Sequence, residues 1–456
     1  MNDAIRYYST NRGAPPVSLR QAVLQGQAPD RGLYMPDRFP VLQADAFRHL
    51  SGKAYSEVAY AVLRLFVADE LDDATLSRLC EDAYDFEVPL EHIAARRYLM
   101  RLDRGPTASF KDFAARMMAR WMGEFIRTAG HDLLILTATS GDTGSAVAHA
   151  YHGVGGVRVV VLFPVKEVSD RQRKQMTTIG DNVTTVGVEG KFDDCQAMVK
   201  RAFADPDLAE FHLTSANSIN IARLLPQAVY YIYSYANLTD AFAGESIVLC
   251  VPSGNFGDMM GAVIARRMGL PVKRIVIATN ANDEVPKFLA TGRYDKIVPS
   301  RVCISNAMNV GHPSNLARLV DVYGGWMDET GELRERPDLD QMRRDFYAIS
   351  IDDEKTRATI KDAYERHKTV LEPHGAVGWA GLERFFADGE APGDQLAVSV
   401  ETAHPAKFPD EIRSILGVEP EAPPSLVGLE ERQETYETIT AEYEPFRDLL
   451  LGRFRR

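Results

Sequence analysis

The sequence predicts an α/β protein built on parallel sheets. From residue 133 onward, short apolar runs end in glycine-rich turns and are followed by amphipathic helical patterns. This alternation is typical of parallel strands that are covered by helices on both faces. The runs are rich in Val, Ile and Leu, as buried strands usually are. The predicted strands are residues 133–137, 158–163, 183–188, 246–251, 274–278 and 395–400.

The length and composition fit a folded, soluble protein with more than one domain. The chain has 456 residues, of which 45% are hydrophobic and 25% are charged. At roughly one domain per 100 to 200 residues, the chain has room for several domains. The net charge is −12. This acidic balance argues against a nucleic-acid partner, because phosphate backbones attract basic proteins.

The cysteines and the N-terminus point to a cytoplasmic protein. Cys80, Cys195, Cys250 and Cys303 lie far apart and form no CxxC pair, which favours a reducing compartment. The first ten residues carry no basic region followed by an apolar run. No apolar stretch reaches the roughly 18 residues that a membrane span needs. We therefore expect a cytoplasmic location and no membrane partner.

Three parts are expected along the chain. Residues 1–95 carry helical patterns at 45–64 and 73–83, separated by loops rich in Pro and Gly, and are predicted to form an N-terminal domain. Residues 96–235 are predicted to form a smaller α/β lobe. Residues 236–456 are predicted to form a larger lobe with a C-terminal tail.

Two helices are expected to serve packing and not chemistry. The stretch 219–238 is rich in tyrosine and reads as a helix of the core or of a subunit contact. The tail ends in an amphipathic pattern that is expected to pack on the body, with apolar positions at Phe446, Leu449, Leu450 and Phe454.

Two segments share one plan, in which a buried strand runs into a glycine-rich turn and then a helix. They are TSGDTG at 139–144 and PSGNFGD at 252–258. Small residues there let backbone N–H groups approach an anion, and the helix N-terminus adds partial positive charge. Neither is a nucleotide motif, and GxxxxGK is absent from the chain. A separate segment, GVGGVR at 153–158, also fails, because Arg158 stands where GxGxxG needs its last glycine. No GxSxG turn marks a serine hydrolase.

A third segment, GPTASFKD at 105–112, places a lysine near a helix start. Ser109 or Thr107 is expected to cap this helix, with Lys111 in its first turn. The helix dipole at that end repels an ammonium, which favours a neutral Lys111. The alternative is a solvated surface lysine paired with Asp112, and on this segment alone the two readings are equally good. A neutral amine is what imine formation requires.

A lysine nucleophile and two anion sites together describe a pyridoxal phosphate site. The segments GPTASFKDFAARMM, LTATSGDTGSAVAHA, GKFDDCQAMVKRAF, TSANSINIARLL, VPSGNFGD and ETAHPAKFP occur in the order and spacing of the threonine synthase family. So does the N-terminal stretch YYSTNRGAPPVSLRQAVLQGQAPDRGLYMP. The resemblance runs from about residue 7 to 409 and is closest to the longer branch of the family, which has a full N-terminal domain.

The resemblance implies the architecture called fold type II, with two α/β lobes, pyridoxal 5'-phosphate between them and an added N-terminal domain. It implies that Lys111 links covalently to the cofactor and later moves protons on the substrate. Thr402 faces the ring nitrogen, where a neutral hydroxyl implies a moderate electron sink. The cofactor phosphate lies on the turn formed by Gly254, Asn255, Phe256 and Gly257, and the neighbouring Asp258 fixes that turn.

For the substrate, the resemblance implies that Ser140, Gly141 and Thr143 hold the α-carboxylate. Many relatives in the wider fold type carry Asn where this chain has Asp142, so Asp142 is expected to pair with the imine proton or with a nearby cation. Asn217 and Arg223 are the expected ligands of a substrate phosphate. Lys174 is a weaker candidate because it lies in a charged run.

The implied reaction converts O-phospho-L-homoserine and water to L-threonine and phosphate. The alternatives are a phospho-lyase or dehydratase of the same fold and, more remotely, a non-catalytic protein that binds pyridoxal phosphate or phosphate. No metal is assigned, since the histidines lack ligand spacing. Both a monomer and a homodimer remain compatible with the sequence.

Overall fold

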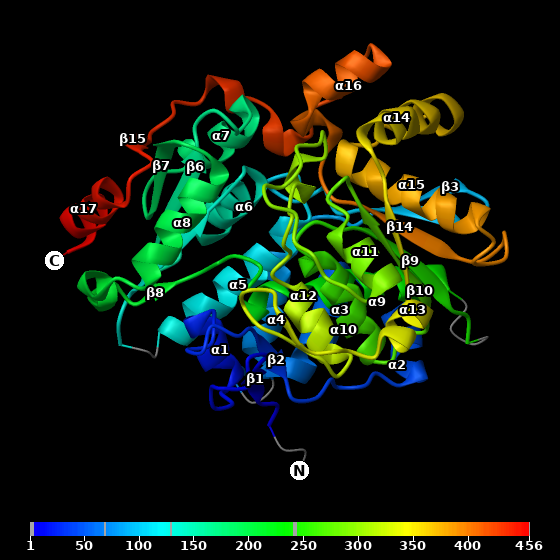
Figure 1. Ribbon diagram of the computed structural model, residues 1–456, viewed down its shortest axis with the longest axis horizontal. Coiled ribbons are helices and arrows are strands. Elements are labelled where there is room, and N and C mark those ends of the chain that lie inside the picture. Colours follow the sequence, from blue (N-terminus) through cyan, green and yellow to red (C-terminus); the bar gives the residue numbers. More distant parts are fainter. Residues whose placement is uncertain (1–3, 68–69, 128–129, 240–243, 456) are drawn as a thin grey trace.

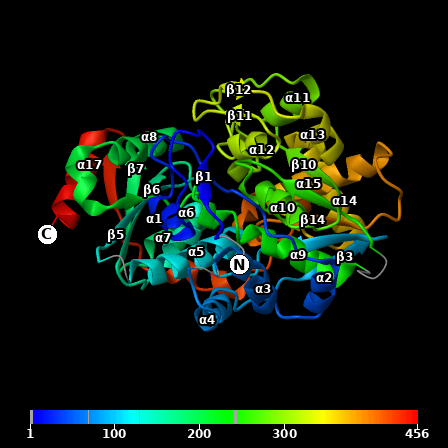
Figure 2. The same cartoon turned by 90° about the horizontal axis from the view of Figure 1, so that it is seen from below.

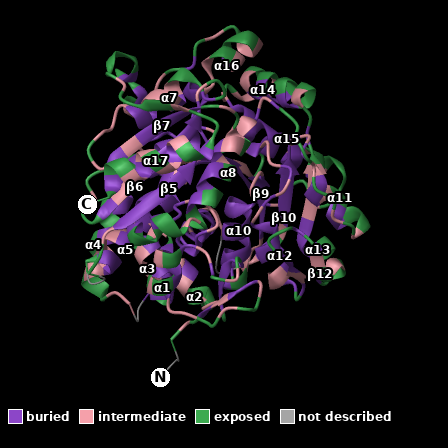
Figure 3. Ribbon diagram, turned by 60° about the vertical axis from the view of Figure 1, so that its left-hand side comes forward, coloured by how far each residue is buried: buried purple, intermediate pink, exposed green. Residues whose placement is uncertain are grey.

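The computed structural model describes residues 4–67, 70–127, 130–239 and 244–455. Two α/β lobes lie side by side, and the N-terminal segment packs beneath both of them (Figures 1 and 2). The long helix α5 (Lys111–Ile126) runs between the N-terminal segment and the smaller lobe. The central strands of both lobes are almost wholly buried, whereas the edge strands and the outer helices are partly exposed (Figure 3).

The smaller lobe is a parallel sheet in the order β15-β7-β6-β5-β8. Its strands are β5 (Leu133–Ala138), β6 (Val157–Pro164), β7 (Val183–Glu189), β8 (Leu213–Thr214) and β15 (Glu437–Thr440). Its helices are α6 (Asp142–Tyr151), α7 (Asp170–Thr177), α8 (Phe192–Phe203) and α17 (Tyr443–Phe454). Alternate residues of β5 face opposite sides: Ile135 joins the core with α5 and α6, and Leu136 joins the one with α8 and α17.

The larger lobe is a sheet in the order β13-β10-β9-β14-β4-β3, parallel except for the pair β3 and β4. Its strands are β3 (Leu90–Ala94), β4 (Arg97–Arg101), β9 (Ile247–Pro252), β10 (Val272–Thr279), β13 (Phe346–Ser350) and β14 (Ala397–Glu401). On one face lie α9 (Gln227–Leu238) and α10 (Gly257–Arg267), and on the other α14 (Asp353–His367) and α15 (Pro373–Ala387).

The remaining elements are shorter or lie outside the sheets. In the N-terminal segment they are β1 (Tyr7–Ser9), α1 (Leu19–Gln25), β2 (Tyr34–Pro36), α2 (Ala44–Leu50), α3 (Tyr55–Val67) and α4 (Asp73–Ala83). Further along are α11 (Glu284–Thr291), α12 (Leu316–Val322), β11 (Trp326–Met327), β12 (Leu333–Glu335), α13 (Leu339–Asp345) and α16 (Pro409–Leu416). None of the helices in the described ranges has the length and apolarity of a transmembrane span.

The six predicted strands are confirmed as β5, β6, β7, β9, β10 and β14. Two predicted helices differ. The pattern at 45–64 is broken into α2 and α3 at Gly52, whose φ of +72° ends the first helix. The helix expected over 219–238 begins only at Gln227, after Pro226, and residues 221–223 form a separate 3₁₀ turn, η2 (Ile221–Arg223).

The two packing expectations hold. On α9, Tyr230, Tyr231 and Tyr235 are buried in the main core. In the tail, Phe446, Leu450 and Phe454 are buried with α8. The tail also adds strand β15 to the edge of the smaller sheet, beside β7. The domain boundaries at residues 95 and 235 stay predictions.

A fully buried arginine ties the N-terminal segment to the lobes. Arg318 on α12 donates to the backbone oxygen of Tyr34 at 3.1 and 3.2 Å and to that of Ile219 at 2.6 Å. It also donates to Ser218 O at 3.1 Å and to Asn315 Oδ1 at 2.7 Å. Burial lowers the pKa of Arg318 to about 9. Its charge is thus spread over carbonyl groups of two distant segments and of the neighbouring Asn315.

We predict that Arg318→Leu lowers the free energy of unfolding by about 2–4 kcal/mol, because several buried carbonyl oxygens lose their donor at once. Urea denaturation followed by circular dichroism measures the change. Arg344→Leu is the control, since Arg344 is exposed and bonds only to Gln341 on its own helix among the described residues. Equal midpoints for the two variants would contradict the prediction.

Candidate active site

The predicted site residues gather where the carboxyl ends of the central strands face the gap between the lobes. Lys111 is the first residue of α5, and Asp142 is the first residue of α6, after β5. Thr402 directly follows β14, and its backbone oxygen accepts a hydrogen bond from Phe110 N at 2.8 Å. This contact brings the lysine segment of one lobe against the end of the other sheet. Open α/β sheets bind their ligands at this edge.

Lys111 lies beside a buried ion pair that contains a second lysine. The Lys111 Nζ is 3.7 Å from Asp142 Oδ2, and Lys407 Nζ is 2.8 Å from Asp142 Oδ1. Lys407 is wholly buried and also donates to Thr107 O at 2.9 Å. Gln172 Nε2 donates to the same Asp142 oxygen at 3.0 Å. Of the two partners expected for Asp142, the structure thus supplies the nearby cation, Lys407.

The charged groups in this cluster shift one another's pKa values. Burial opposes ionisation of Asp142, but Lys407 and Lys111 outweigh it and hold the pKa of that carboxyl far below its usual range. Burial lowers the pKa of Lys111, as do the nearby cations Lys407 and Arg223, whereas Asp142 raises it. The net shift is downward, so Lys111 has a larger neutral fraction than an ordinary lysine.

The start of α5 differs from the expected cap. Its N-cap residue is Phe110, which makes no side-chain cap bond, so neither Ser109 nor Thr107 caps the helix. Instead the Asp112 carboxylate accepts from Thr107 N at 2.8 Å and from Thr107 Oγ1 at 2.7 Å. Asp112 is therefore turned back into the preceding loop and does not pair with Lys111. The surface-lysine reading of Lys111 is wrong, because its side chain is 15% exposed.

The turn at 254–257 is a tightly held helix start. Phe256 is the N-cap residue of α10 with a φ of +62°, a left-handed conformation that is uncommon for a bulky side chain. Asn255 donates to Ser218 Oγ at 2.5 Å and accepts from Ser314 N at 2.8 Å. A Cβ on Gly254 would stand 2.8 Å from Met308 Cα, so only glycine fits.

Asp258 faces away from that turn and fixes α10 against α9. Its Oδ1 accepts from the hydroxyl groups of Tyr230 at 2.5 Å and Tyr231 at 2.6 Å. Burial raises the pKa of Asp258 to about 6, although the tyrosine bonds and Lys111 oppose this. These bonds join α10 to α9, and the expected role of Asp258 in fixing the turn stays a prediction.

The turn after β5 requires its glycine. Gly141 has a φ of +131°, and a Cβ there would stand 2.5 Å from the Gln172 side chain. Thr139 Oγ1 accepts from the backbone N–H groups of Gly141 at 2.9 Å and Gly144 at 2.8 Å. Ser140 and Thr143 are half-buried on either side of this bend. The bend therefore brings Ser140 and Thr143 to the N-terminal end of α6.

Asn217 and Arg223 carry buried polar atoms in need of a partner. Arg223 is 4% exposed and donates through one terminal nitrogen to Ala216 O at 2.5 Å. Its Nε and the Oδ1 of Asn217 have no hydrogen-bond partner among the described residues. Burial lowers the pKa of Arg223 to about 10. Lys174, by contrast, reaches an exposed carbonyl, that of Glu430.

Thr402 rests on the carboxylate of Glu372, which is not among the predicted site residues. Its hydroxyl donates to Glu372 Oε1 at 3.0 Å, and both residues are buried. His404, two residues further on, caps the next turn, where its Nδ1 accepts from Ala406 N at 3.1 Å. Glu372 and Lys407 were missed because each stands in a segment where local pattern pointed to other residues.

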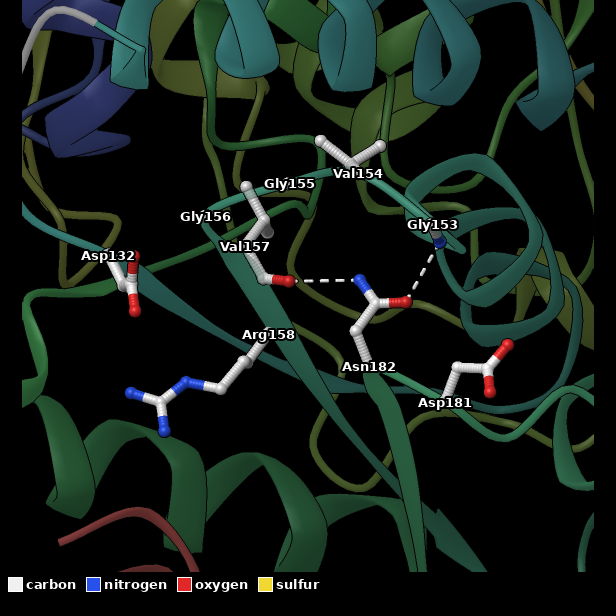
Figure 4. A pocket seen from close by; sticks show the side chains of 9 residues that line it. All are labelled: Asp132, Gly153, Val154, Gly155, Gly156, Val157, Arg158, Asp181 and Asn182. Carbon is white, nitrogen blue, oxygen red and sulfur yellow. Dashed lines mark hydrogen bonds between the residues drawn. The ribbon is translucent and has the colours of Figure 1, made fainter. Parts of the chain in front are cut away.

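Two hollows lie at the opposite end of the smaller sheet, near the residues where β5, β6 and β7 begin. One of about 440 Å³ is lined by Asp132, residues 153–158, Asp181 and Asn182 (Figure 4). Its central Asn182 is committed to backbone, since Nδ2 donates to Val157 O at 2.9 Å and Oδ1 accepts from Gly153 N at 2.9 Å. This hollow holds none of the predicted site residues, so it does not compete with the gap between the lobes.

The gap offers groups that suit pyridoxal phosphate. Lys111 supplies a buried amine, the N-terminus of α10 supplies an anion site, and Thr402 supplies a hydroxyl on a rigid support. A family model described as "Pyridoxal-phosphate dependent enzyme" matches residues 88–403. Models for "Threonine synthase N terminus" and "Threonine synthase, C-terminal" match residues 6–84 and 375–449. The chain belongs to the threonine synthase family.

Individual relatives agree over nearly the full chain. The chain is 37% identical to threonine synthase of Serratia marcescens, covering 96% of each protein, and 36% identical to that of Escherichia coli, covering 96% of this chain and 97% of the relative. A crystal structure of PLP-bound threonine synthase from Brucella melitensis superposes with a TM-score of 0.92 at 34% identity, covering 99% of this chain and 100% of that one. The predicted family, fold type, threonine synthase activity and pyridoxal phosphate cofactor are thereby confirmed.

Within this threonine synthase fold, the ion pair of Asp142 and Lys407 is testable by a double-mutant cycle. We predict that Asp142→Asn and Lys407→Met each cost about 3–5 kcal/mol of unfolding free energy, because each leaves the other buried charge without its nearest counterion. The double variant is expected to be more stable than either single variant. Urea titrations of all four proteins measure the coupling.

The exposed pair of Arg413 and Asp410 is the matched control, with side chains 55% and 94% exposed. Asp410→Asn is expected to cost less than about 1 kcal/mol. Additive effects of the two buried substitutions would show that Asp142 and Lys407 do not depend on each other.

Proposed function

We propose that the protein converts O-phospho-L-homoserine and water to L-threonine and phosphate, with Lys111 as the lysine that links to the cofactor. In this proposal the cofactor phosphate lies on the turn 254–257, and Thr402 faces the ring nitrogen. When bound, pyridoxal phosphate withdraws electrons from the substrate carbons and so makes their protons removable. We further propose a cytoplasmic location, supported by four free, buried cysteines.

Lys111 is the proposed proton carrier. It lies next to Asp142, which stays ionised because the positive charge of Lys407 stabilises the carboxylate. Burial and the nearby cations lower the pKa of Lys111, so that part of it is a neutral amine. In the proposal this amine takes a proton from one substrate carbon and returns it to another. The bend at Ser140, Gly141 and Thr143 receives the substrate carboxylate, since the N-terminus of α6 lies there.

The observation that carries the choice of substrate is Arg223. A buried guanidinium with an unpartnered Nε in the described structure is costly unless an anion completes it. It lies close enough to Lys111 to influence the pKa of that amine. A phosphate on the far end of a homoserine chain would supply the missing anion, with Asn217 beside it.

The reaction itself is the first test. Purified protein is loaded with cofactor and given O-phospho-L-homoserine, and the products are separated by chromatography. We expect threonine and phosphate in equal amounts, and no turnover in Lys111→Ala, which also loses the visible absorbance of the lysine-bound cofactor. Phosphate accompanied by a 2-oxo acid and ammonia would instead identify a phospho-lyase.

The role of Arg223 is tested by Arg223→Met. We expect kcat/KM for O-phospho-L-homoserine to fall by roughly 100-fold or more, because a buried charged contact to phosphate is worth at least about 2–5 kcal/mol. Cofactor absorbance is expected to persist. Arg201→Met is the control, since Arg201 is 60% exposed and pairs with Glu444 on the surface. A variant with unchanged KM and kcat would remove Arg223 from the phosphate site.

A further inference from the structure

Beneath Thr402 lies a buried set of hydrogen bonds whose directions are fixed. We name Glu372, His374 and Glu401 the Glu372 network. Glu372 Oε1 accepts from Thr402 Oγ1 at 3.0 Å and from Gly375 N at 2.9 Å. Its Oε2 accepts from His374 N at 2.7 Å and contacts His374 Nδ1 at 2.5 Å. Glu372 is fully buried and is the N-cap residue of α15.

The tautomer of His374 follows from its other nitrogen. Ala307 N lies 3.0 Å from His374 Nε2 and can only donate, so Nε2 is an acceptor without a proton. A neutral His374 then carries its proton on Nδ1, which donates to Glu372 Oε2. Both oxygens of Glu372 are therefore filled by donors, two of which are backbone N–H groups that cannot turn away.

Of the two adjacent buried carboxyl groups, Glu372 is the one that carries the charge. Glu401 Oε1 accepts from Glu372 N at 2.7 Å, and its Oε2 has no hydrogen-bond partner among the described residues. Burial and the charge of Glu372 raise the pKa of Glu401 well above its usual range, although Arg101 on β4 opposes this. Glu372, with donors at every position, is the ionised partner.

An ionised Glu372 commits the proton of Thr402. A hydroxyl has one proton and two lone pairs, and here the proton points to Glu372. Toward the gap beside Lys111, Thr402 can then offer only lone pairs. A ring nitrogen that carries a proton can donate to it, whereas an unprotonated ring nitrogen would face another acceptor.

We propose that Glu372 is a positioning residue that makes Thr402 a hydrogen-bond acceptor and so selects pyridoxal phosphate with a protonated ring nitrogen. This rests on the proposed placement of the ring nitrogen at Thr402. It reverses the expectation from the sequence that a neutral hydroxyl gives only a moderate electron sink. The carboxylate acts one residue removed from the cofactor, without touching it.

The Glu372→Gln variant reverses the direction of the network. The amide must turn its NH₂ group either toward the two N–H groups of His374 or toward Gly375 N and Thr402. The His374 side is closed, because its Nδ1 proton is fixed through Ala307. The NH₂ group therefore faces Gly375 N and Thr402, where only the single bond from Gly375 N is lost. Thr402 accepts from the NH₂ group and turns its own proton toward the gap. Thr402 then becomes a donor, which suits an unprotonated ring nitrogen.

The test is the ¹⁵N NMR shift of ring-labelled pyridoxal phosphate bound to the full-length protein without substrate, recorded at neutral pH. Reduction with borohydride and mass spectrometry first establish that Lys111 carries the cofactor in each protein. We expect the wild-type resonance in the protonated region. In Glu372→Gln it is expected in the unprotonated region, with kcat lowered roughly 10- to 100-fold, the usual effect of removing a residue that orients a direct ligand.

Three further variants keep the test decisive if the loss of the α15 cap prevents Glu372→Gln from folding. Thr402→Ser keeps a hydroxyl, so the ring nitrogen of the cofactor is expected to stay protonated in that variant. In the similarly shaped Thr402→Val, the ring nitrogen is expected to be unprotonated. Glu383→Gln, a substitution of a half-buried glutamate on the same helix, is the matched control and is expected to match the wild type.

An unprotonated wild-type resonance would overturn the proposal, and so would a protonated one in Glu372→Gln or Thr402→Val. The readout uses no substrate, so it is separate from the proposed function. A protein that forms no threonine but shifts its resonance with Glu372→Gln would refute the reaction and leave the inference standing. A protein that forms threonine without any shift would do the opposite.

Discussion

The buried ion pair between Asp142 and Lys407 is the constraint on which the arrangement of the two lobes depends. Asp142 opens α6 in the smaller lobe, and Lys407 follows β14 of the larger sheet, so the 2.8 Å contact crosses the gap at the place where Lys111 lies. Neither charge is stable in the interior without the other. The same carboxylate that holds the lobes together therefore also sets the charge around the reactive lysine.

The N-terminal segment takes part in building the site through the residues just before α9. Asn220 donates to Val23 O at 2.8 Å, and Arg318 connects Tyr34 with Ser218 and Ile219. Residues 215–223 carry Asn217 and Arg223, so the proposed phosphate ligands lie on a segment clamped between the N-terminal segment and the larger lobe. The hydrogen bonds of Asn220 and Arg318 hold the backbone of that segment from both sides.

Local patterns in the sequence were enough for the strands and the glycine-rich turns. A buried strand and the turn after it are encoded by neighbouring residues, so the segments around Gly141, Gly254 and Lys111 stand out. Lys407 and Glu372 do not, because their significance comes from Asp142 and Thr402, which are distant in sequence. The capping expectation at Thr107 failed for a local reason, since Asp112 turns back to bind the residue expected to act as the cap.

The Glu372 network also joins the two ends of the proposed cofactor position. Ala307, which fixes the tautomer of His374, belongs to the loop that closes over Gly254, where an added Cβ would stand 3.0 Å from Ala307 O. Backbone N–H groups set the direction of the hydrogen bonds at Ala307, His374 and Gly375, and rotation of a side chain cannot reverse them. A movement of Ala307 relative to Gly254 would thus change the hydrogen bond to His374 first, and Thr402 only through His374 and Glu372. The polarity offered to the ring nitrogen is therefore a property of the backbone fold around α15, and only a change of the acceptor at Glu372 can invert it.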